Sequence, residues 1–145
     1  MMPKQCISKD ANETISLGEK MAKQLKPGDV LCLTGDLGSG KTTFVKGLAR
    51  GLKLGEELVH SPTFTLMNVY EGKGKKSLFH FDLYRVEKIT EIFSLDYEEY
   101  LYGDGISVVE WAEKLGKLMP KTYWEIEFVH KGEQKRFITI QKRQK

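Results

Sequence analysis

The sequence contains little of what a membrane, secreted or metal-cluster protein requires. Its 145 residues include two cysteines, Cys6 and Cys32, which are far apart and match no metal-ligand spacing. No apolar run approaches the roughly 20 residues of a membrane span, and no apolar stretch of a secretory signal follows Met1–Cys6. We therefore expect a cytoplasmic protein without a membrane partner, in which Cys32 is a buried free thiol rather than a ligand or half of a disulfide.

Signatures of several nucleotide-binding classes are also missing. There is no Asn-Lys-x-Asp for reading guanine and no Ser-Gly-Gly-Gln of transporter ATPases. Only four arginines are present, Arg50, Arg85, Arg136 and Arg143, whereas a small-molecule kinase usually places an arginine-rich lid over the phosphates. These absences disfavour a translation-type GTPase and a transporter ATPase. The small number of arginines also makes a small-molecule kinase a weaker hypothesis.

What is present is the composition of one folded domain. Hydrophobic residues make up 40% and charged residues 30% of a 16.6 kDa chain, which is enough to bury a core and is untypical of a disordered protein. There is no internal repeat and no proline- or serine-rich linker. The length and composition predict a single domain over residues 1–145.

Charge is distributed unevenly around a net value of +3. Residues 131–145 carry six Lys/Arg and one Glu, a net +5, and the rest of the chain is −2. This basic end could contact nucleic acid or an acidic partner, or it could be a solvated strand and a frayed terminus. Glu87–Asp104 holds six acids and one lysine, which argues against the whole protein surface binding along an RNA backbone.

The pattern of apolar and turn-forming residues predicts an α/β sheet with antiparallel additions. The continuous apolar run Val30–Thr34 is typical of a strand buried on both faces, and a helix is expected from Lys41 to about Leu52. Before them we expect a strand at Gln5–Ser8 and a helix capped by Asn12. After them we expect a hairpin of Thr63–Tyr70 with Ser77–Asp82, followed by helical pieces at Glu87–Phe93 and Tyr97–Tyr102. A buried strand, Ile106–Glu110, and a short helix come next. The last expected element is a hairpin at a sheet edge, formed by Tyr123–His130 and Lys135–Gln141.

A phosphate-binding loop lies between the first buried strand and its helix. Gly35-Asp36-Leu37-Gly38-Ser39-Gly40-Lys41-Thr42 satisfies G-x-x-x-x-G-K-[ST]. Glycines let successive N–H groups turn inward, the helix start adds a positive dipole end, Lys41 reaches the β/γ-phosphates and Thr42 offers a hydroxyl to Mg²⁺. The motif predicts a P-loop NTPase fold, a mainly parallel sheet with antiparallel additions flanked by helices.

Two later strands each run from apolar residues into a single acid. Leu78–Asp82 ends at Asp82, and Ile106–Glu110 ends at Glu110. Each acid alone could be a surface carboxylate at a strand end. Together with a P-loop, however, the two strand ends predict a site for Mg²⁺ and the attacking water.

Three further residues have two interpretations each. Thr63 follows the P-loop helix, where nucleotide switches place a threonine that senses the γ-phosphate, although Ser-Pro-Thr is also an ordinary strand entry. His80 is interpreted as a strand residue with a local hydrogen bond rather than as a catalytic base. Trp111 could belong to the core, or an exposed position beside Glu110 would suggest a lid or partner contact.

These motifs occur in an order that resembles the TsaE (YjeE) family over nearly the whole chain. The matching segments are Gly35–Thr43, Ser61–Leu66, His80–Arg85 and Val109–Trp111. The resemblance implies a bacterial P-loop ATPase that acts with TsaB and TsaD in forming threonylcarbamoyladenosine beside the anticodon of tRNA. TsaD makes the transfer to tRNA, and the TsaE-like subunit binds the TsaB–TsaD pair and hydrolyses ATP to reset it.

The resemblance also implies roles for particular residues. Lys41, Asp82 and Glu110 would be catalytic, and Thr42, Asp82 and Glu110 would hold Mg²⁺. Ser39 stands where alanine is frequent, which should leave the loop intact. The implied nucleotide-binding residues are Ala11, Thr14, Asp36, Gly38, Ser39, Gly40, Lys41, Thr42, Thr43, Thr63, Trp111 and Arg136.

Three hypotheses follow for the function. The leading one is a Mg²⁺-dependent ATPase subunit that is weakly active alone, is stimulated by TsaB and TsaD, and meets tRNA only through their complex. The second is a small-molecule kinase that uses the same P-loop. The third is an RNA-binding module that uses the basic end.

Overall fold

The computed structural model describes residues 4–35, 40–55, 59–60, 66–71, 77–93, 96–101, 103–132 and 135–144. These residues form a seven-stranded sheet in the order β1-β7-β6-β2-β5-β4-β3. The four central strands, β6, β2, β5 and β4, are parallel to one another, and the outer strands are antiparallel to their neighbours. The strands are β1 (Lys4–Ser8), β2 (Val30–Gly35), β3 (Met67–Glu71), β4 (Ser77–Asp82), β5 (Ile106–Glu110), β6 (Thr122–His130) and β7 (Arg136–Gln144).

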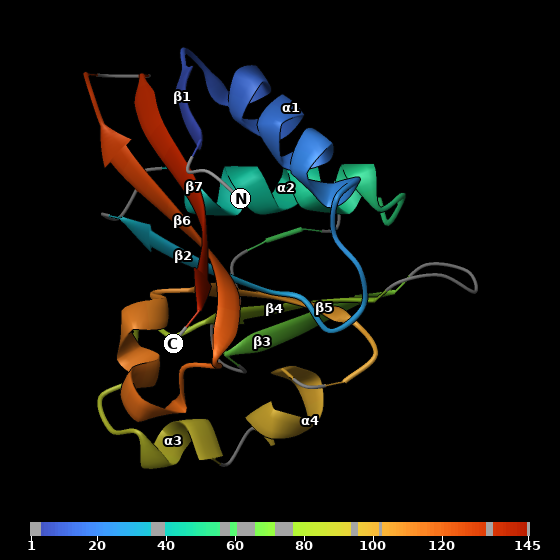
Figure 1. Ribbon diagram of the computed structural model, residues 1–145, viewed down its shortest axis with the longest axis vertical. Coiled ribbons are helices and arrows are strands. Elements are labelled where there is room, and N and C mark those ends of the chain that lie inside the picture. The colour runs from blue at the N-terminus through green and yellow to red at the C-terminus, as the bar shows by residue number, and fades with distance from the viewer. Residues whose placement is uncertain are drawn as a thin grey trace.

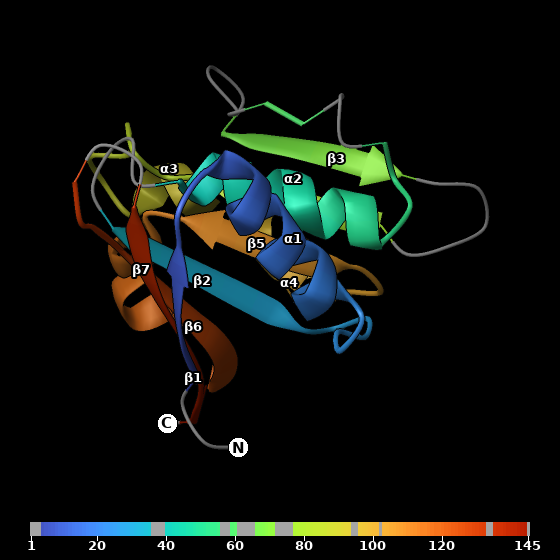
Figure 2. The same ribbon diagram turned by 90° about the horizontal axis from the view of Figure 1, so that it is seen from above.

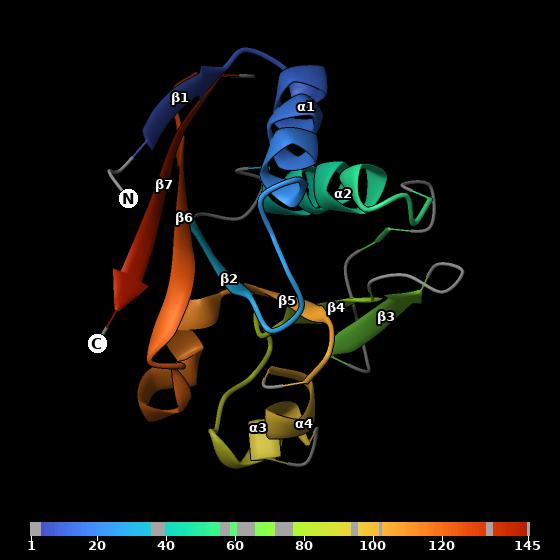
Figure 3. The same cartoon turned by 45° about the vertical axis from the view of Figure 1, so that its right-hand side comes forward.

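Helices cover both faces of the central strands. Figures 1 and 3 show helices α1 (Ala11–Ala22) and α2 (Lys41–Gly51) on one side, with α3 (Thr90–Phe93) and α4 (Tyr97–Leu101) on the other. The 3₁₀ helix η2 (Ala112–Leu118) packs on the α3–α4 side. The predicted fold, an α/β sheet with a parallel centre, antiparallel additions and flanking helices, is thereby confirmed.

Strand β2 is buried on both faces, as its continuous apolar run predicts. Its side chains alternate: Leu31 and Leu33 belong to the core under α1 and α2, whereas Val30 and Cys32 belong to the core on the α3–α4 side. Cys32 is a free, buried thiol, as expected. Burial and the nearby Glu125 raise its pKa from 9.0 to about 12, so the thiol stays neutral and serves as a packing group.

Helix α1 begins two residues before the predicted position. The predicted cap, Asn12, lies inside the first turn, and Asp10 is the N-cap instead, with its side chain accepting the N–H of Glu13 at 2.9 Å. Glu13 in turn accepts the N–H of Lys9 at 2.8 Å. The second bond resembles a capping box, although it goes to the residue before the cap, and the Asp-x-x-Glu spacing was the better signal.

The C-terminal hairpin corrects a second expectation. It was predicted at a sheet edge, but β6 pairs with β2 in the sheet centre, and β7 is covered by β1. β1 therefore forms the edge strand on this side of the sheet, and β3 forms the edge strand on the other. Among the described residues, no helix combines the length and the apolar character that crossing a membrane requires.

Helices α1 and α2 cross closely (Figure 2), and glycines lie at the crossing. A Cβ placed on Gly18 would lie 2.5 Å from the carbonyl oxygen of Phe44, and one on Gly47 would lie 2.1 Å from the carbonyl oxygen of Ile15. Both obstacles are backbone atoms that no rotamer change can move. The crossing therefore fixes the position of α2, and with it the start of the helix that follows the P-loop.

Gly47→Ala is accordingly expected to destabilise the fold by at least about 2 kcal/mol, since separating two packed helices outweighs the helix-propensity gain of about 1 kcal/mol. Urea unfolding measures this free energy. Ser16→Ala, on the exposed face of α1, is the control and should change it by less than about 0.5 kcal/mol. Equal stability of the two variants would contradict the close crossing.

Candidate active site

Three neighbouring parallel strands end at one edge of the sheet. β2 runs into the P-loop, β4 ends at Asp82 and β5 ends at Glu110. The register pairs Asp82 with Glu110, and Glu110 with Leu33 of β2. The carboxyl edge of parallel strands is where open α/β sheets bind ligands. The loop and the two predicted acids are therefore brought together.

The P-loop is described at its two ends. Asp36, Gly38 and Ser39 lie outside the described residues, as does Thr63 of the predicted switch. Gly40 is the N-cap of α2, and its φ of 104° lies in the left-handed region that favours glycine. Lys41, Thr42 and Thr43 form the first turn of α2, so the positive end of this helix directly follows the loop.

Lys41 is held inside the protein. Its side chain is buried, Nζ donates a hydrogen bond to the carbonyl oxygen of Gly35, and the ammonium lies 3.6 Å from the ring centroid of Trp111. An arriving phosphate would have to compete with both contacts. Lys41, at one end of the P-loop, thus contacts both Gly35 at the other end and Trp111.

Trp111 has an unusual backbone for a large side chain. Its φ of 61° and ψ of 41° are left-handed, and its N–H donates to the carbonyl oxygen of Leu33 at 3.1 Å. The ring is half-buried and lies 5.1 Å from the ring of Tyr84, centroid to centroid. Such strained positions cluster at functional sites. The ring packs against the core on the α3–α4 side, which agrees with the first interpretation of Trp111, and the lid or partner contact stays a prediction.

Thr42 and Glu110 are in direct contact. The Thr42 hydroxyl lies 3.0 Å from Oε2 and 3.3 Å from Oε1 of Glu110, and only 3% of Glu110 is exposed. Among the described residues no group of three or more His, Cys, Asp and Glu side chains could hold a metal unaided. Mg²⁺ commonly binds through one or two carboxylates together with substrate phosphates and water. The oxygen donors Thr42, Asp82 and Glu110 fit that requirement.

Asp82 lies beside Glu110 but in a different environment. It is half-buried, and its Oδ1 accepts the N–H of Tyr84 at 3.0 Å. Burial raises the pKa of this carboxyl, and the charge of Glu110 adds to the rise, while the Tyr84 bond, His80 and Lys41 oppose it. The two acids therefore differ, because Glu110 is enclosed among polar partners and Asp82 is only half-buried.

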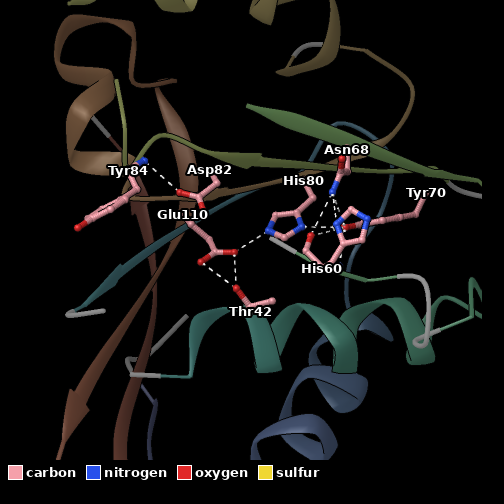
Figure 4. A network of polar contacts seen from close by, with 8 residues as sticks. All are labelled: Thr42, His60, Asn68, Tyr70, His80, Asp82, Tyr84 and Glu110. Atoms are coloured by element: carbon pink, nitrogen blue, oxygen red, sulfur yellow. Dashed lines mark hydrogen bonds and ion pairs between the residues drawn. The ribbon is translucent and has the colours of Figure 1, made fainter. Parts of the chain in front are cut away.

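His80 was interpreted as a strand residue with a local hydrogen bond, and its bond instead spans two strands. The ring is completely buried, and Nε2 lies 2.6 Å from Oε2 of Glu110 (Figure 4). Its Nδ1 lies 3.1 Å from the hydroxyl of Tyr70. The alternation His80-x-Asp82 could have given the signal, because residues two apart on a strand share a face.

The other implied nucleotide contacts occupy different places. Ala11 is exposed at the start of α1, and Thr14 is buried with its hydroxyl 2.6 Å from that of Ser8. Arg136 begins β7 and reaches the P-loop, since a Cβ on Gly40 would lie 3.3 Å from its Nε. The structure thus brings Arg136 to the loop, and shows Ala11 and Thr14 within the capped start of α1.

The basic end is largely part of the sheet. Residues 136–144 form β7, Arg143 pairs with Glu125 at 2.9 Å, and the Lys142 ammonium lies 4.6 Å from the ring centroid of Trp124. Residues 136–144 are therefore a strand with partly solvated side chains, as the second interpretation expected, and not a frayed end. Their side chains also have partners within the chain, which weakens the RNA-binding hypothesis.

Comparison with known proteins gives a consistent result. The TsaE family model, described as threonylcarbamoyl adenosine biosynthesis protein TsaE, matches residues 8–138. Two relatives bear the name tRNA threonylcarbamoyladenosine biosynthesis protein TsaE. That of Bacillus subtilis is 43% identical over 88% of this chain and 78% of its own, and that of Aquifex aeolicus is 49% identical over 77% and 78%. The crystal structure of Bacillus subtilis YdiB superposes with a TM-score of 0.78 at 33% identity, covering 99% of this chain and 87% of that one.

Proposed function

The chain belongs to the TsaE family, whose proteins act in tRNA threonylcarbamoyladenosine biosynthesis, and on this premise we propose that it is the ATP-binding and ATP-hydrolysing subunit of that process. We further propose that hydrolysis requires Mg²⁺, is weak in the isolated chain, and is stimulated by TsaB and TsaD in the cytoplasm. The chain would act as one domain over residues 1–145 and meet tRNA only through the complex.

One observation carries the proposal: the start of the P-loop helix and the two strand-end acids share one edge of the sheet. Thr42 contacts Glu110, and Glu110 is the register partner of Asp82. A P-loop supplies phosphate binding, but hydrolysis also needs a metal-binding carboxylate and a group that orients water. Convergence of these parts supports hydrolysis over simple nucleotide binding.

The residues would divide the work as follows. Lys41 and the loop amides, including those of Asp36, Gly38, Ser39 and Gly40, would hold the β/γ-phosphates. Thr42 and Glu110 would bind Mg²⁺, which when bound neutralises charge on the phosphate oxygens. Asp82 would orient the attacking water or take part in metal binding, and Thr43, Thr63, Trp111 and Arg136 would surround the nucleotide, with Ala11 and Thr14 toward the base.

The resting contacts of Lys41 support a weak basal activity. This lysine is bonded to the carbonyl oxygen of Gly35 and stacked on Trp111, and both contacts compete with its binding to phosphate. Two of the four arginines, Arg50 and Arg143, are paired with Glu19 and Glu125. These features favour a site whose active arrangement forms when a partner binds, as stimulation by TsaB and TsaD would require.

Phosphate release from Mg–ATP tests the proposal. We expect slow release by the chain alone, faster release when TsaB and TsaD are both added, and no transfer to small-molecule acceptors. The two partners without this chain are the control. A phosphorylated acceptor together with no response to TsaB and TsaD would identify a kinase and overturn the proposal.

A further inference from the structure

We propose that His80 is a positioning residue that holds the Glu110 carboxylate in the orientation required for Mg²⁺, and that Tyr70 fixes the orientation and hydrogen bonding of its ring. The inference rests on the proposed function, because it concerns the metal that serves ATP hydrolysis. It adds a function for a buried strand residue whose side chain does not itself reach the phosphates.

The geometry places Glu110 between two side chains from different elements. Thr42 of α2 approaches the carboxylate from one side, and His80 of β4 approaches it from the other, with Nε2 at 2.6 Å from Oε2 (Figure 4). The His80 side chain is completely buried, and 4% of the Glu110 side chain is exposed. In such surroundings a short bond between an N–H and a carboxylate fixes the carboxylate firmly.

The hydroxyl of Tyr70 lies beside the ring nitrogen of His80 that does not contact Glu110. It has one hydrogen, and its two candidate acceptors are Nδ1 of His80 at 3.1 Å and the carbonyl oxygen of His60 at 3.0 Å. If it donates to Nδ1, the ring carries its proton on Nε2. In that arrangement Nε2–H donates to Oε2 of Glu110 at 2.6 Å, and both ring nitrogens are held by groups on the neighbouring strands β3 and β5.

The outer end of this network is also fixed. The side-chain amide of Asn68 donates toward the carbonyl oxygen of His60 at 3.1 Å and toward the Tyr70 hydroxyl at 3.2 Å, and the His60 N–H approaches that hydroxyl at 3.3 Å. The contacts connect β3, β4 and β5 with the backbone of His60. Tyr70 is therefore held by groups on two segments, and it can hold the His80 ring in turn.

A merely structural role for this network leads to a different expectation. Removing a partner from a buried carboxylate costs stability in either case. A positioning role additionally predicts weaker binding of Mg²⁺, because hydrogen-bond partners that orient metal ligands typically contribute 10- to 100-fold to metal affinity. Mg²⁺ affinity therefore separates the two roles, and stability alone does not.

The experiment measures Mg²⁺-dependent binding of ADP by calorimetry, with unfolding followed in parallel. For His80→Leu we expect the Mg²⁺ concentration at half-maximal effect to rise about 10- to 100-fold. His80→Gln retains an N–H that can reach Glu110 and should restore most of that loss. Glu110→Ala is the positive control. Phe81→Leu, one residue along β4 and in the core on the other face, controls for lost stability and should leave Mg²⁺ dependence unchanged.

The outcomes are distinguishable. Wild-type Mg²⁺ dependence in folded His80→Leu would overturn the inference, and so would equal losses in His80→Leu and Phe81→Leu. If His80→Leu does not fold, Tyr70→Phe provides the test, with a smaller shift in the same direction expected and an unchanged Mg²⁺ response contradicting the inference. Failure of the proposed function would look different, because the wild-type chain would then show no Mg²⁺-dependent nucleotide binding at all.

Discussion

Lys41→Ala is expected to lower ATP hydrolysis in the presence of TsaB and TsaD by at least about 100-fold. Charge develops on the oxygens of the transferring phosphoryl group, and Lys41 would place a cation there at the start of α2. Phosphate release at saturating Mg–ATP measures the loss. Calorimetry with ADP should also show weaker binding, because the same cation would contact the β-phosphate.

Lys46→Ala is the matched control for this variant. It removes the same charge from a later turn of the same helix, and hydrolysis should remain close to that of the wild type. Because Lys41 is buried, thermal unfolding of both variants must be compared before activities are interpreted. If folded Lys41→Ala hydrolyses ATP as fast as Lys46→Ala does, Lys41 does not act on the phosphates.

Approximate energies show why Lys41 would leave its resting contacts when a nucleotide binds. A cation over an aromatic ring contributes about 0.5–2 kcal/mol, and the contact with the carbonyl of Gly35 is one hydrogen bond. A charged phosphate offers bonds of about 1.5–3 kcal/mol each. Two such bonds would outweigh the resting contacts by only a small margin, and a partner that displaced Trp111 would widen that margin.

The features predicted correctly from the sequence are those that depend on local pattern. The continuous apolar run of β2 predicts a buried strand, and the acids at the ends of β4 and β5 follow from the same reasoning. Their convergence was also predictable, because carboxyl ends of parallel strands share an edge. These predictions require parallel strands, but they do not require the order in which the strands pair.

The features that sequence reasoning missed depend on pairing between distant segments. The hairpin of β6 and β7 was placed at an edge because nothing local indicates that β6 pairs with β2 or that β1 adds outside β7. The bond between His80 and Glu110 was missed for the same reason, since it requires the register of β4 on β5. Asp10 was missed as a cap because Asn12 is an equally good capping type and only the Glu13 spacing separates them.

Asp82→Ala is expected to abolish ATP hydrolysis while leaving Mg²⁺-dependent ADP binding measurable. A group that accepts or orients the proton of an attacking nucleophile typically contributes 10²- to 10⁴-fold, so phosphate release should fall by at least about 100-fold even with TsaB and TsaD present. Asp82→Asn preserves the shape of the side chain and should lose as much, because an amide cannot replace the carboxylate charge.

The contacts of the two acids explain why Asp82 is assigned this role. Glu110 is enclosed, with Thr42 at its two oxygens and His80 at one of them, an arrangement suited to a fixed metal ligand. Asp82 is half-buried and bonded through one oxygen to the Tyr84 N–H. Asp104→Asn, at an exposed acid just before β5, is the control and should keep full activity. Wild-type turnover in Asp82→Ala would show that Glu110, or a residue of a partner, orients the water instead.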